Sequence, residues 1–183
     1  MTQFTAIDFE TGCGRRDSAC SVALCTVTDG EITSRFSNLI CPPDPDFDFE
    51  MINIGIHGIT PGMVRNEPTF DLLWPQILPL LEDHLVVAHS ASFDISVLRA
   101  LVELYKLDCP DFDYTCTCQM ARKVFPDLPD HKLDTVADHL DIPLKHHDAE
   151  SDAEASAKIA IDCANRENVQ NPGLICGTKS FRK

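Results

Sequence analysis

The segment Phe4–Thr11 sets two carboxylates, Asp8 and Glu10, two residues apart inside an otherwise apolar, strand-like run. Residues two apart in a β-strand point to the same face of the sheet, so both carboxylates are expected on one face. Like charges on a buried face repel one another and are costly to remove from water. A divalent cation offsets both costs, because Mg²⁺, Mn²⁺ and Ca²⁺ prefer hard oxygen ligands. This segment alone leaves open the alternative of an edge strand with two solvated acids.

The order of apolar runs along the chain predicts a mixed sheet flanked by helices. Short runs with strand character are expected to form strands at Phe4–Phe9, Ala19–Thr28, Ile32–Cys41, Leu85–Ala88 and Phe112–Cys118. Segments with apolar residues at helical spacing are expected to form helices at Thr69–Leu81, Ser92–Tyr105, Gln119–Val124, Leu133–Leu140 and Asp148–Glu167. Three strands in succession, followed by strands that alternate with helices, indicate an α/β three-layer fold with a mixed five-stranded sheet.

The length of 183 residues favours one domain with a sizeable core. We expect this domain over residues 1–168 and a short C-terminal tail over residues 169–183. The first residues lack the basic and apolar regions of a signal peptide, and no apolar run approaches the roughly 20 residues that span a bilayer. A cytoplasmic protein without a membrane partner is therefore expected.

The charge balance restricts the way in which the chain can bind nucleic acid. A formal net charge of −14 argues against a protein that coats long duplexes through a basic surface. It leaves open an enzyme that binds a few nucleotides through metal ions and a handful of local cations. Arg15 with Arg16, and Arg122 with Lys123, are among the available basic positions.

Nine cysteines occur without a CxxC pair, and several of them lie within apolar strand-like runs. Buried free thiols in a reducing compartment are favoured over disulfides for such a pattern. Cys116 and Cys118 would share one face of a strand and raise the alternative of a structural zinc site. However, no second Cys or His pair has finger-like spacing.

Two further acids follow predicted buried elements. Asp94 lies just after the strand Leu85–Ala88, at the start of the next helix, where a carboxylate is also favoured by the helix dipole. His147 and Asp152 are five residues apart and do not share a face of one regular helix. They converge only if His147 lies in the preceding loop and Asp152 lies in the helix, with Asp148 as the N-cap. His146 is expected to be a surface neighbour.

Together, Asp8-Phe-Glu10-Thr, His89-Ser-Ala-Ser-Phe-Asp94 and His147-Asp-Ala-Glu-Ser-Asp152 resemble the three ordered motifs of the DEDDh exonucleases. This DnaQ-like group includes the epsilon proofreading subunit of bacterial DNA polymerase III, RNase T and oligoribonuclease. The resemblance covers residues from about 4 to 164, extends to His57-Gly-Ile-Thr60, and is strongest to small stand-alone epsilon-like members. The chain departs from the family at Ser90, where Asn is frequent, and at Gly12–Arg16, where many members have a second Thr.

The resemblance implies an RNase H-like fold and a metal-dependent 3′–5′ exonuclease that releases nucleoside 5′-monophosphates. Its cofactors would be two divalent cations, Mg²⁺ or Mn²⁺. Asp8 would bridge both ions, Glu10 and Asp152 would hold the ion near the nucleophile, and Asp94 would complete the site, partly through water. His147 would act as general base, because the pKa of an imidazole lies near the operating pH.

The implied substrate contacts are less specific than the catalytic set. The candidates are Phe9, Thr11, His57, Ser90 and Phe93. Stacking of bases on apolar groups is expected near the site, but both phenylalanines are equally suited to the core, and His57 to a structural role in its loop.

The expected partners are single-stranded 3′ ends, with DNA favoured over RNA. An oligoribonuclease-like or RNase T-like enzyme is the alternative within the family, because discrimination depends on contacts to one 2′-OH. A non-catalytic, polymerase-associated subunit that binds nucleic-acid ends is an alternative of another class. A stand-alone repair or clean-up enzyme is favoured over a proofreader attached to a polymerase.

Overall fold

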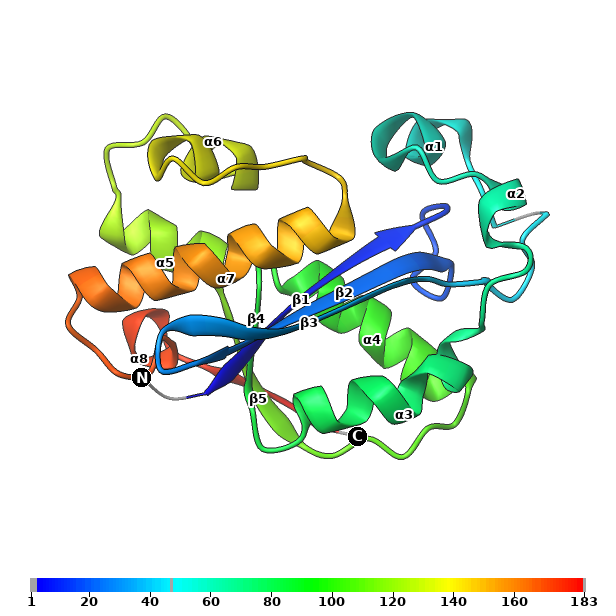
Figure 1. The fold of residues 1–183 in the computed structure, drawn as a ribbon, viewed down its shortest axis with the longest axis horizontal. Coiled ribbons are helices and arrows are strands. Elements are labelled where there is room, and N and C mark those ends of the chain that lie inside the picture. Colours follow the sequence, from blue (N-terminus) through cyan, green and yellow to red (C-terminus); the bar gives the residue numbers. More distant parts are fainter. Residues whose placement is uncertain (1–2, 47, 183) are drawn as a thin grey trace.

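The computed structural model describes residues 3–46 and 48–182, which form a mixed sheet with the strand order β3-β2-β1-β4-β5-β6 (Figure 1). The strands are β1 (Phe4–Thr11), β2 (Ala19–Thr28), β3 (Glu31–Leu39), β4 (Leu85–Ala88), β5 (Phe112–Cys116) and β6 (Lys179–Phe181). Strands β1, β4 and β5 are parallel, while β2, β3 and β6 are antiparallel to their neighbours. The predicted mixed α/β sheet is confirmed.

The helices cover both faces of the sheet (Figure 1). They are α1 (Met51–His57), α2 (Pro61–Val64), α3 (Phe70–Leu81), α4 (Ser92–Leu104), α5 (Thr117–Val124), α6 (Leu133–His139), α7 (Ala149–Arg166) and α8 (Gly173–Cys176). One hydrophobic core joins the sheet to α3 and α4, and a second joins it to α5, α6 and α7. Figure 1 shows α1 and α2 beyond the end of β1, next to the start of α7.

Alternation along β1 divides its side chains between the two cores. Ile7 and Phe9 enter the core with α3 and α4, whereas Ala6 enters the core with α7. Because the side-chain period of a strand is two, Asp8 and Glu10 lie on the α7 side with Ala6. The strand that carries the predicted metal ligands is therefore central in the sheet and buried on both faces.

A tight hairpin turn at Asp29 and Gly30 joins β2 to β3. Asp29 and Gly30 both have positive φ, 52° and 84°, as the two central residues of a type I′ turn require. The predicted helix with two internal prolines also forms, because α3 buries the whole apolar stripe Phe70, Leu73, Trp74, Ile77 and Leu81.

The prediction of five strands is wrong, because the segment expected as a tail supplies a sixth. Lys179–Phe181 pairs antiparallel with β5, and the Phe181 ring stacks on Phe112 with 4.8 Å between ring centroids. The strand expected to reach Cys118 ends at Cys116, where α5 begins. Among the described residues, no helix combines the length and apolar character that crossing a bilayer requires.

Replacement of Phe181 by alanine tests whether the C-terminal segment belongs to the core. Phe181 is 1% exposed and also lies under the Arg99 guanidinium, so its removal leaves a cavity. Phe181→Ala is expected to lower the free energy of unfolding by about 3–5 kcal/mol, measured by urea denaturation.

Leu174→Ala is the matched control in the same segment, since Leu174 is 69% exposed. This change is expected to cost less than about 0.5 kcal/mol. Equal, small effects of both substitutions would show that the segment is a dispensable tail.

Candidate metal centre and active site

Three carboxylates from two elements converge at the end of β1. Asp8 and Glu10 project from the strand toward α7, and Asp152 projects from the first turn of that helix. One ligand oxygen of each lies within 4.8 Å of the others. Asp152 is only 3% exposed, and Asp8 and Glu10 are half-buried. The predicted pair on one strand face is thus part of a larger cluster.

Asp94 fixes the start of α4 against the same strand. It is 1% exposed, and one of its oxygens, Oδ1, accepts a hydrogen bond of 3.1 Å from the backbone N–H of Phe9. The carboxylate therefore lies beside Asp8, and its charge raises the pKa of Asp8 after the larger effect of burial. All four predicted acids belong to one electrostatic cluster.

The start of α7 has the geometry that the spacing of its motif required. The Asp148 side chain caps the helix by accepting a hydrogen bond from the Ser151 N–H at 3.2 Å. His147 lies in the preceding loop with φ of 66°, and its backbone N–H donates to Asp152 Oδ2 at 3.0 Å. His147 and Asp152 are therefore neighbours although they are five residues apart.

His146 reaches the site, which the sequence did not predict. Its Nδ1 lies 3.0 Å from Asp152 Oδ2, and its ring stacks on His147 with 3.8 Å between centroids. The expectation that His146 is merely a surface neighbour is wrong. No periodic pattern distinguishes two consecutive loop histidines, so the sequence held no signal for the difference.

Ionising the carboxylates of this cluster costs free energy when no positive charge lies among them. Burial, followed by repulsion from Asp152 and Asp148, raises the pKa of Glu10 to about 8. Burial likewise raises the pKa of Asp94 and Asp152 above their usual range. Because burial and mutual repulsion raise the pKa of these four acids, they need a cation to be ionised together.

A buried carboxylate oxygen without a hydrogen-bond partner indicates that a metal ion fits this cluster. Asp152 Oδ1 is buried and has no hydrogen-bond partner among the described residues, which is rare for a buried oxygen. A carboxylate oxygen that faces two further carboxylates is a ligand for a hard divalent cation. The donor set Asp8, Glu10 and Asp152, with Asp94 beside it, therefore suits Mg²⁺ or Mn²⁺.

Of the predicted substrate contacts, Phe9 belongs to the core. Its side chain is 2% exposed and lies 6.0 Å from the Phe70 ring, measured between centroids. The hypothesis that Phe9 stacks on substrate is not supported, because its neighbours Asp8 and Glu10 occupy the opposite face of the strand. Thr11 is also buried, at 5% exposed.

His57 holds its loop to the end of β1. The Ile59 N–H donates to His57 Nδ1 at 3.0 Å, so Nε2 carries the proton and donates to the Thr11 carbonyl oxygen at 3.2 Å. Burial lowers the pKa of His57, which keeps this ring neutral. The ring also borders a groove of about 490 Å³ that His147 lines from the other side.

Two further candidates lie near the start of α4: Ser90 just before the helix and Phe93 in its first turn. Ser90 is exposed and has a positive φ of 65°, while Phe93 is partly exposed and carries the Arg16 guanidinium 4.5 Å from its ring centroid. Arg16, which no motif marked, thereby lies over Phe93, the residue before Asp94.

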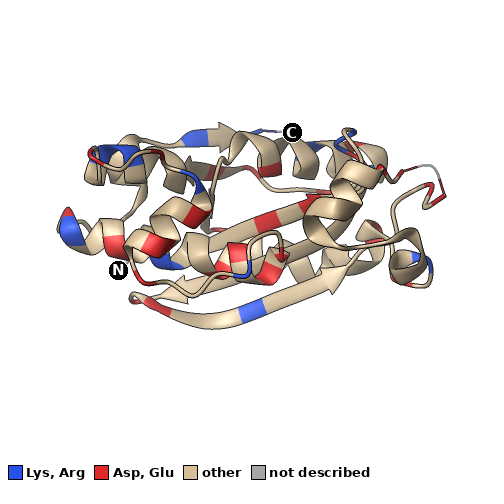
Figure 2. Cartoon of the chain, turned by 90° about the horizontal axis from the view of Figure 1, so that it is seen from above, with Lys and Arg blue, Asp and Glu red and all other residues tan. Residues whose placement is uncertain are grey.

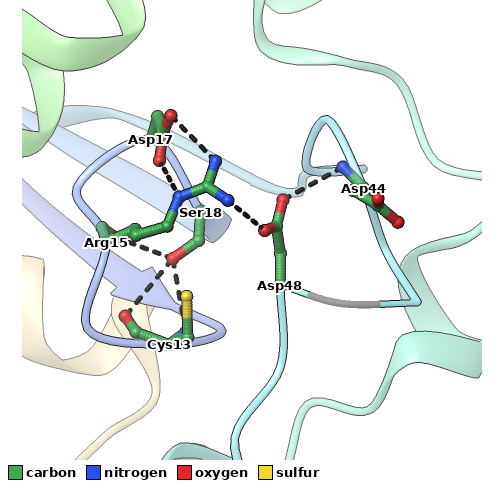
Figure 3. Close-up of polar contacts among 6 residues, drawn as sticks. All are labelled: Cys13, Arg15, Asp17, Ser18, Asp44 and Asp48. Atoms are coloured by element: carbon green, nitrogen blue, oxygen red, sulfur yellow. Dashed lines mark hydrogen bonds and ion pairs between the residues drawn. The ribbon is translucent and has the colours of Figure 1, made fainter.

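Polar contacts fix the loop that carries Arg16 (Figure 3). Arg15 forms ion pairs with Asp17 at 2.9 Å and with the buried Asp48 at 3.0 Å. A Cβ at Gly12 would lie 2.2 Å from the Asp48 carbonyl oxygen, so only glycine permits this approach. The segment Gly12–Arg16, where the chain departs from the family, is thus an ordered loop held by its own ion pairs and close contacts.

A family model described as Exonuclease (RNase_T) matches residues 5–160. The chain belongs to this exonuclease family. It is 33% identical over 162 residues to the DNA polymerase III PolC-type of Clostridium perfringens, covering 86% of this chain and 11% of that protein. It is 29% identical over 166 residues to the 3′-5′ exonuclease DinG of Bacillus subtilis, covering 87% of this chain and 17% of that protein. The chain therefore spans less than a fifth of either relative.

Solved structures of exonucleases share the fold. Exonuclease X in complex with 5′-overhanging duplex DNA superposes with a TM-score of 0.76 and 26% identity, covering 94% of this chain and 97% of that one. The nuclease domain of 3′hExo, a DEDDh family member bound to rAMP, superposes with a TM-score of 0.76 at 17% identity. The match covers 99% of this chain and 96% of that one. The resemblance to DEDDh exonucleases and the RNase H-like fold are confirmed.

The stability of the metal-free protein is expected to fall as pH rises. The unfolded Glu10 carboxyl loses its proton near its ordinary pKa of 4.5, whereas the folded one holds it to about 8. Between these values the folded state binds more protons than the unfolded state, so its stability decreases with rising pH. Saturating Mg²⁺ or Mn²⁺ at pH 8 is expected to raise Tm by about 5–10 °C in thermal unfolding.

Asp8→Asn removes one charge and one candidate metal ligand, so its metal-free Tm should exceed that of the wild type at pH 8 and its metal-induced rise should vanish. Glu103→Gln, an exposed acid on α4, is the control that should retain the full rise. A metal-induced rise that Asp8→Asn leaves intact would contradict the assignment of these ligands.

Proposed function

We propose that the chain is a metal-dependent exonuclease that removes nucleoside 5′-monophosphates from the 3′ end of single-stranded DNA. The observation that carries this proposal is the convergence of Asp8, Glu10, Asp94 and Asp152, with a buried, unpartnered oxygen on Asp152. Such a site is built to bind cations and, through them, the phosphate of a substrate.

Asp8, Glu10, Asp94 and Asp152 would hold the divalent cations, with Glu10 and Asp152 on the side of the nucleophile. When bound, the two ions would stabilise the negative charge that develops on the attacking and leaving oxygens. The protein contributes rigidity, because a hydrogen bond of Asp94 joins α4 to β1, and a hydrogen bond of Asp152 holds the His147 loop against the start of α7. The carboxylates are thus placed before any substrate arrives.

His147 is proposed as the general base that takes a proton from the attacking water. Burial lowers its pKa, so the neutral, proton-accepting form prevails at neutral pH. The ring borders the groove that also contacts His57, and it stacks on His146. His146, whose Nδ1 lies on Asp152, would orient that carboxylate and support the His147 ring.

The charge distribution favours a short single strand. Figure 2 shows acidic positions spread over the sheet and the helices, and the net charge is −14. A surface of this sign repels a long duplex, so contact is restricted to the few nucleotides near the metal centre. Phe93 under Arg16 offers a base-stacking and cationic surface at its border.

DNA is favoured because relatives by sequence include the DNA polymerase III PolC-type proteins, which also raise a polymerase context for this domain. RNA is the second candidate, because a neighbour of the same fold is bound to rAMP and another recognises a histone mRNA stem-loop. A cytoplasmic location stays a prediction.

Two histidine variants test the assignment of the base. His147→Ala is expected to lower kcat by about 10²–10⁴-fold, the usual contribution of a general base. His146→Ala, its stacked neighbour, is expected to lose less than about tenfold, because it removes support and no proton acceptor. Gel assays on a 5′-labelled DNA oligomer measure both rates with Mg²⁺ and with Mn²⁺. Wild-type rates in His147→Ala together with a large loss in His146→Ala would reverse the two roles.

Matched DNA and RNA oligomers of one sequence test the substrate. The DNA strand is expected to shorten from its 3′ end faster than the RNA strand, and a 3′-phosphate block should stop the reaction. Faster loss of the RNA strand would establish the alternative of an exoribonuclease. Inactivity on every free end with either metal, in a protein whose Tm still responds to that metal, would favour a non-catalytic subunit that binds ends.

A further inference from the structure

A second cavity lies beside the metal centre at the same edge of the sheet. It has a volume of about 320 Å³ and is bordered by Ser90, by the end of β5, and by the starts of α5 and β6. Three of the nine cysteines line it: Cys116, Cys118 and Cys176. All nine thiols of the chain are free. This thiol cavity has no part in the proposed nuclease reaction.

Two helix starts meet at Cys116. The residue ends β5 and is the N-cap of α5, and His89 holds the start of α4 nearby through hydrogen bonds to Thr117 at 3.0 Å and to the His131 carbonyl oxygen at 2.9 Å. Cys116 directly precedes the first turn of α5, whose backbone N–H groups have no partner within the helix. Unpaired N–H groups at helix starts stabilise an anion, and a thiolate is one.

The neighbouring thiol adds to this effect. The hydrogen bond from Cys118, followed by those from the backbone, lowers the pKa of Cys116 to about 5 although burial opposes the change. The same contact and burial raise the pKa of Cys118. The Cys118 sulfur also lies 3.2 Å from the His131 carbonyl oxygen, and its single proton serves one of these two acceptors at a time. The pKa values of these two neighbouring cysteines are thus moved in opposite directions.

Cationic side chains border the cavity in an otherwise acidic protein. Arg122 and Lys179 line it, and neither forms an ion pair within the described residues. Other cations, such as Arg35 with Glu154 and Arg65 with Asp46, are paired. The cavity therefore attracts anions to a partly exposed sulfur.

The other cysteines differ from Cys116 in their surroundings. Burial raises the pKa of Cys25 to about 11 and that of Cys163 to about 12. Among the described residues, the groups of potential metal ligands that lie within 4.8 Å of one another consist of carboxylates and histidines. The three cysteines of the cavity do not form such a group, which favours thiol chemistry over metal binding here.

We infer that Cys116 is a nucleophilic thiol site for small anionic disulfides and electrophiles, with Cys118 as its resolving thiol. The Cys116 thiolate attacks one sulfur of a small disulfide, a new S–S bond forms, and the other half leaves as a thiolate. The Cys118 sulfur, after its proton passes to solvent, then attacks Cys116 and releases the second half. Cys116 and Cys118 are oxidised to a disulfide, and the small disulfide is reduced to two thiols.

Alkylation locates the site without any mutation. Several groups face the Cys116 sulfur from the surrounding elements: Cys118 and Arg122 on α5, His89 and Asp94 around the start of α4, His131, Lys179 and Cys176. At pH 6 a cysteine of low pKa is mostly thiolate, whereas an ordinary cysteine is almost entirely thiol. The thiolate of low pKa is intrinsically less nucleophilic, but its abundance still makes alkylation about tenfold faster than at an ordinary cysteine. Iodoacetate at pH 6 should therefore modify Cys116 first, identified by fragment-ion mass spectrometry of the native protein.

The exposed Cys176 is the internal control. The rate at Cys116 should stay flat as the pH rises above 6, because its thiolate is already abundant there. Iodoacetate should react with Cys116 faster than neutral iodoacetamide does, relative to their rates at Cys176, and Arg122→Gln should reduce this preference. First modification of Cys176 at pH 6, or a Cys116 rate that rises steeply with pH, would overturn the inference.

Glutathione disulfide, which carries several carboxylates, tests the resolving thiol. The wild type should lose two hydrogens at Cys116 and Cys118 without a lasting adduct, whereas Cys118→Ser should accumulate one glutathione on Cys116. Cys41→Ser should behave as the wild type, and circular dichroism verifies that each variant is folded. A lasting adduct in the wild type, or a disulfide from Cys116 to Cys176, would contradict the role of Cys118.

Discussion

The alternation of side chains along β1 is the constraint on which the rest of the molecule depends. One set, with Ile7 and Phe9, supports the core under α3 and α4, and the other turns Asp8 and Glu10 toward α7. The helix approaches closely because its buried face is made largely of small residues, among them Ala149, Ala153, Ala157, Ala160 and Ala164. Small side chains let backbones come near, and Asp152 at the start of this face is thereby brought onto Asp8. A one-residue slip of β1 would exchange its core and its ligands together.

Most of the fold follows from patterns that are local in the sequence. The strands at Ala19–Thr28 and Leu85–Ala88 form at the predicted bounds, because each is a continuous apolar run that only a buried strand accommodates. The sixth strand escaped prediction because Lys179–Phe181 has one buried side chain and too few residues to show a period. Its position is decided by a distant partner, Phe112, which no local pattern can reveal.

The site was predictable to the extent that spacing fixes geometry. The separation of five positions between His147 and Asp152 demanded a loop followed by a helix, and the structure has both. The orientation of Phe9 could also be predicted from the sequence, since a residue between two same-face carboxylates of a strand points to the other face. In contrast, the contact of His146 with Asp152 and the placement of Arg16 over Phe93 depend on loop conformations. Loops are determined by partners far along the chain, as Gly12 and Asp48 illustrate.

The carboxyl ends of β1, β4 and β5 gather two kinds of reactive group along one edge of the sheet. At β1 the groups are carboxylates, which suit hard cations, and at β5 they are thiols, which suit soft electrophiles. Both adjoin α4, since Asp94 in its first turn ties it to β1, and Ser90 and Ala91 before it line the thiol cavity. Because ligand preferences differ this sharply, Mg²⁺ at the first site and a disulfide reagent at the second do not compete for the same atoms. A single helix start can therefore support two independent chemistries within one small domain.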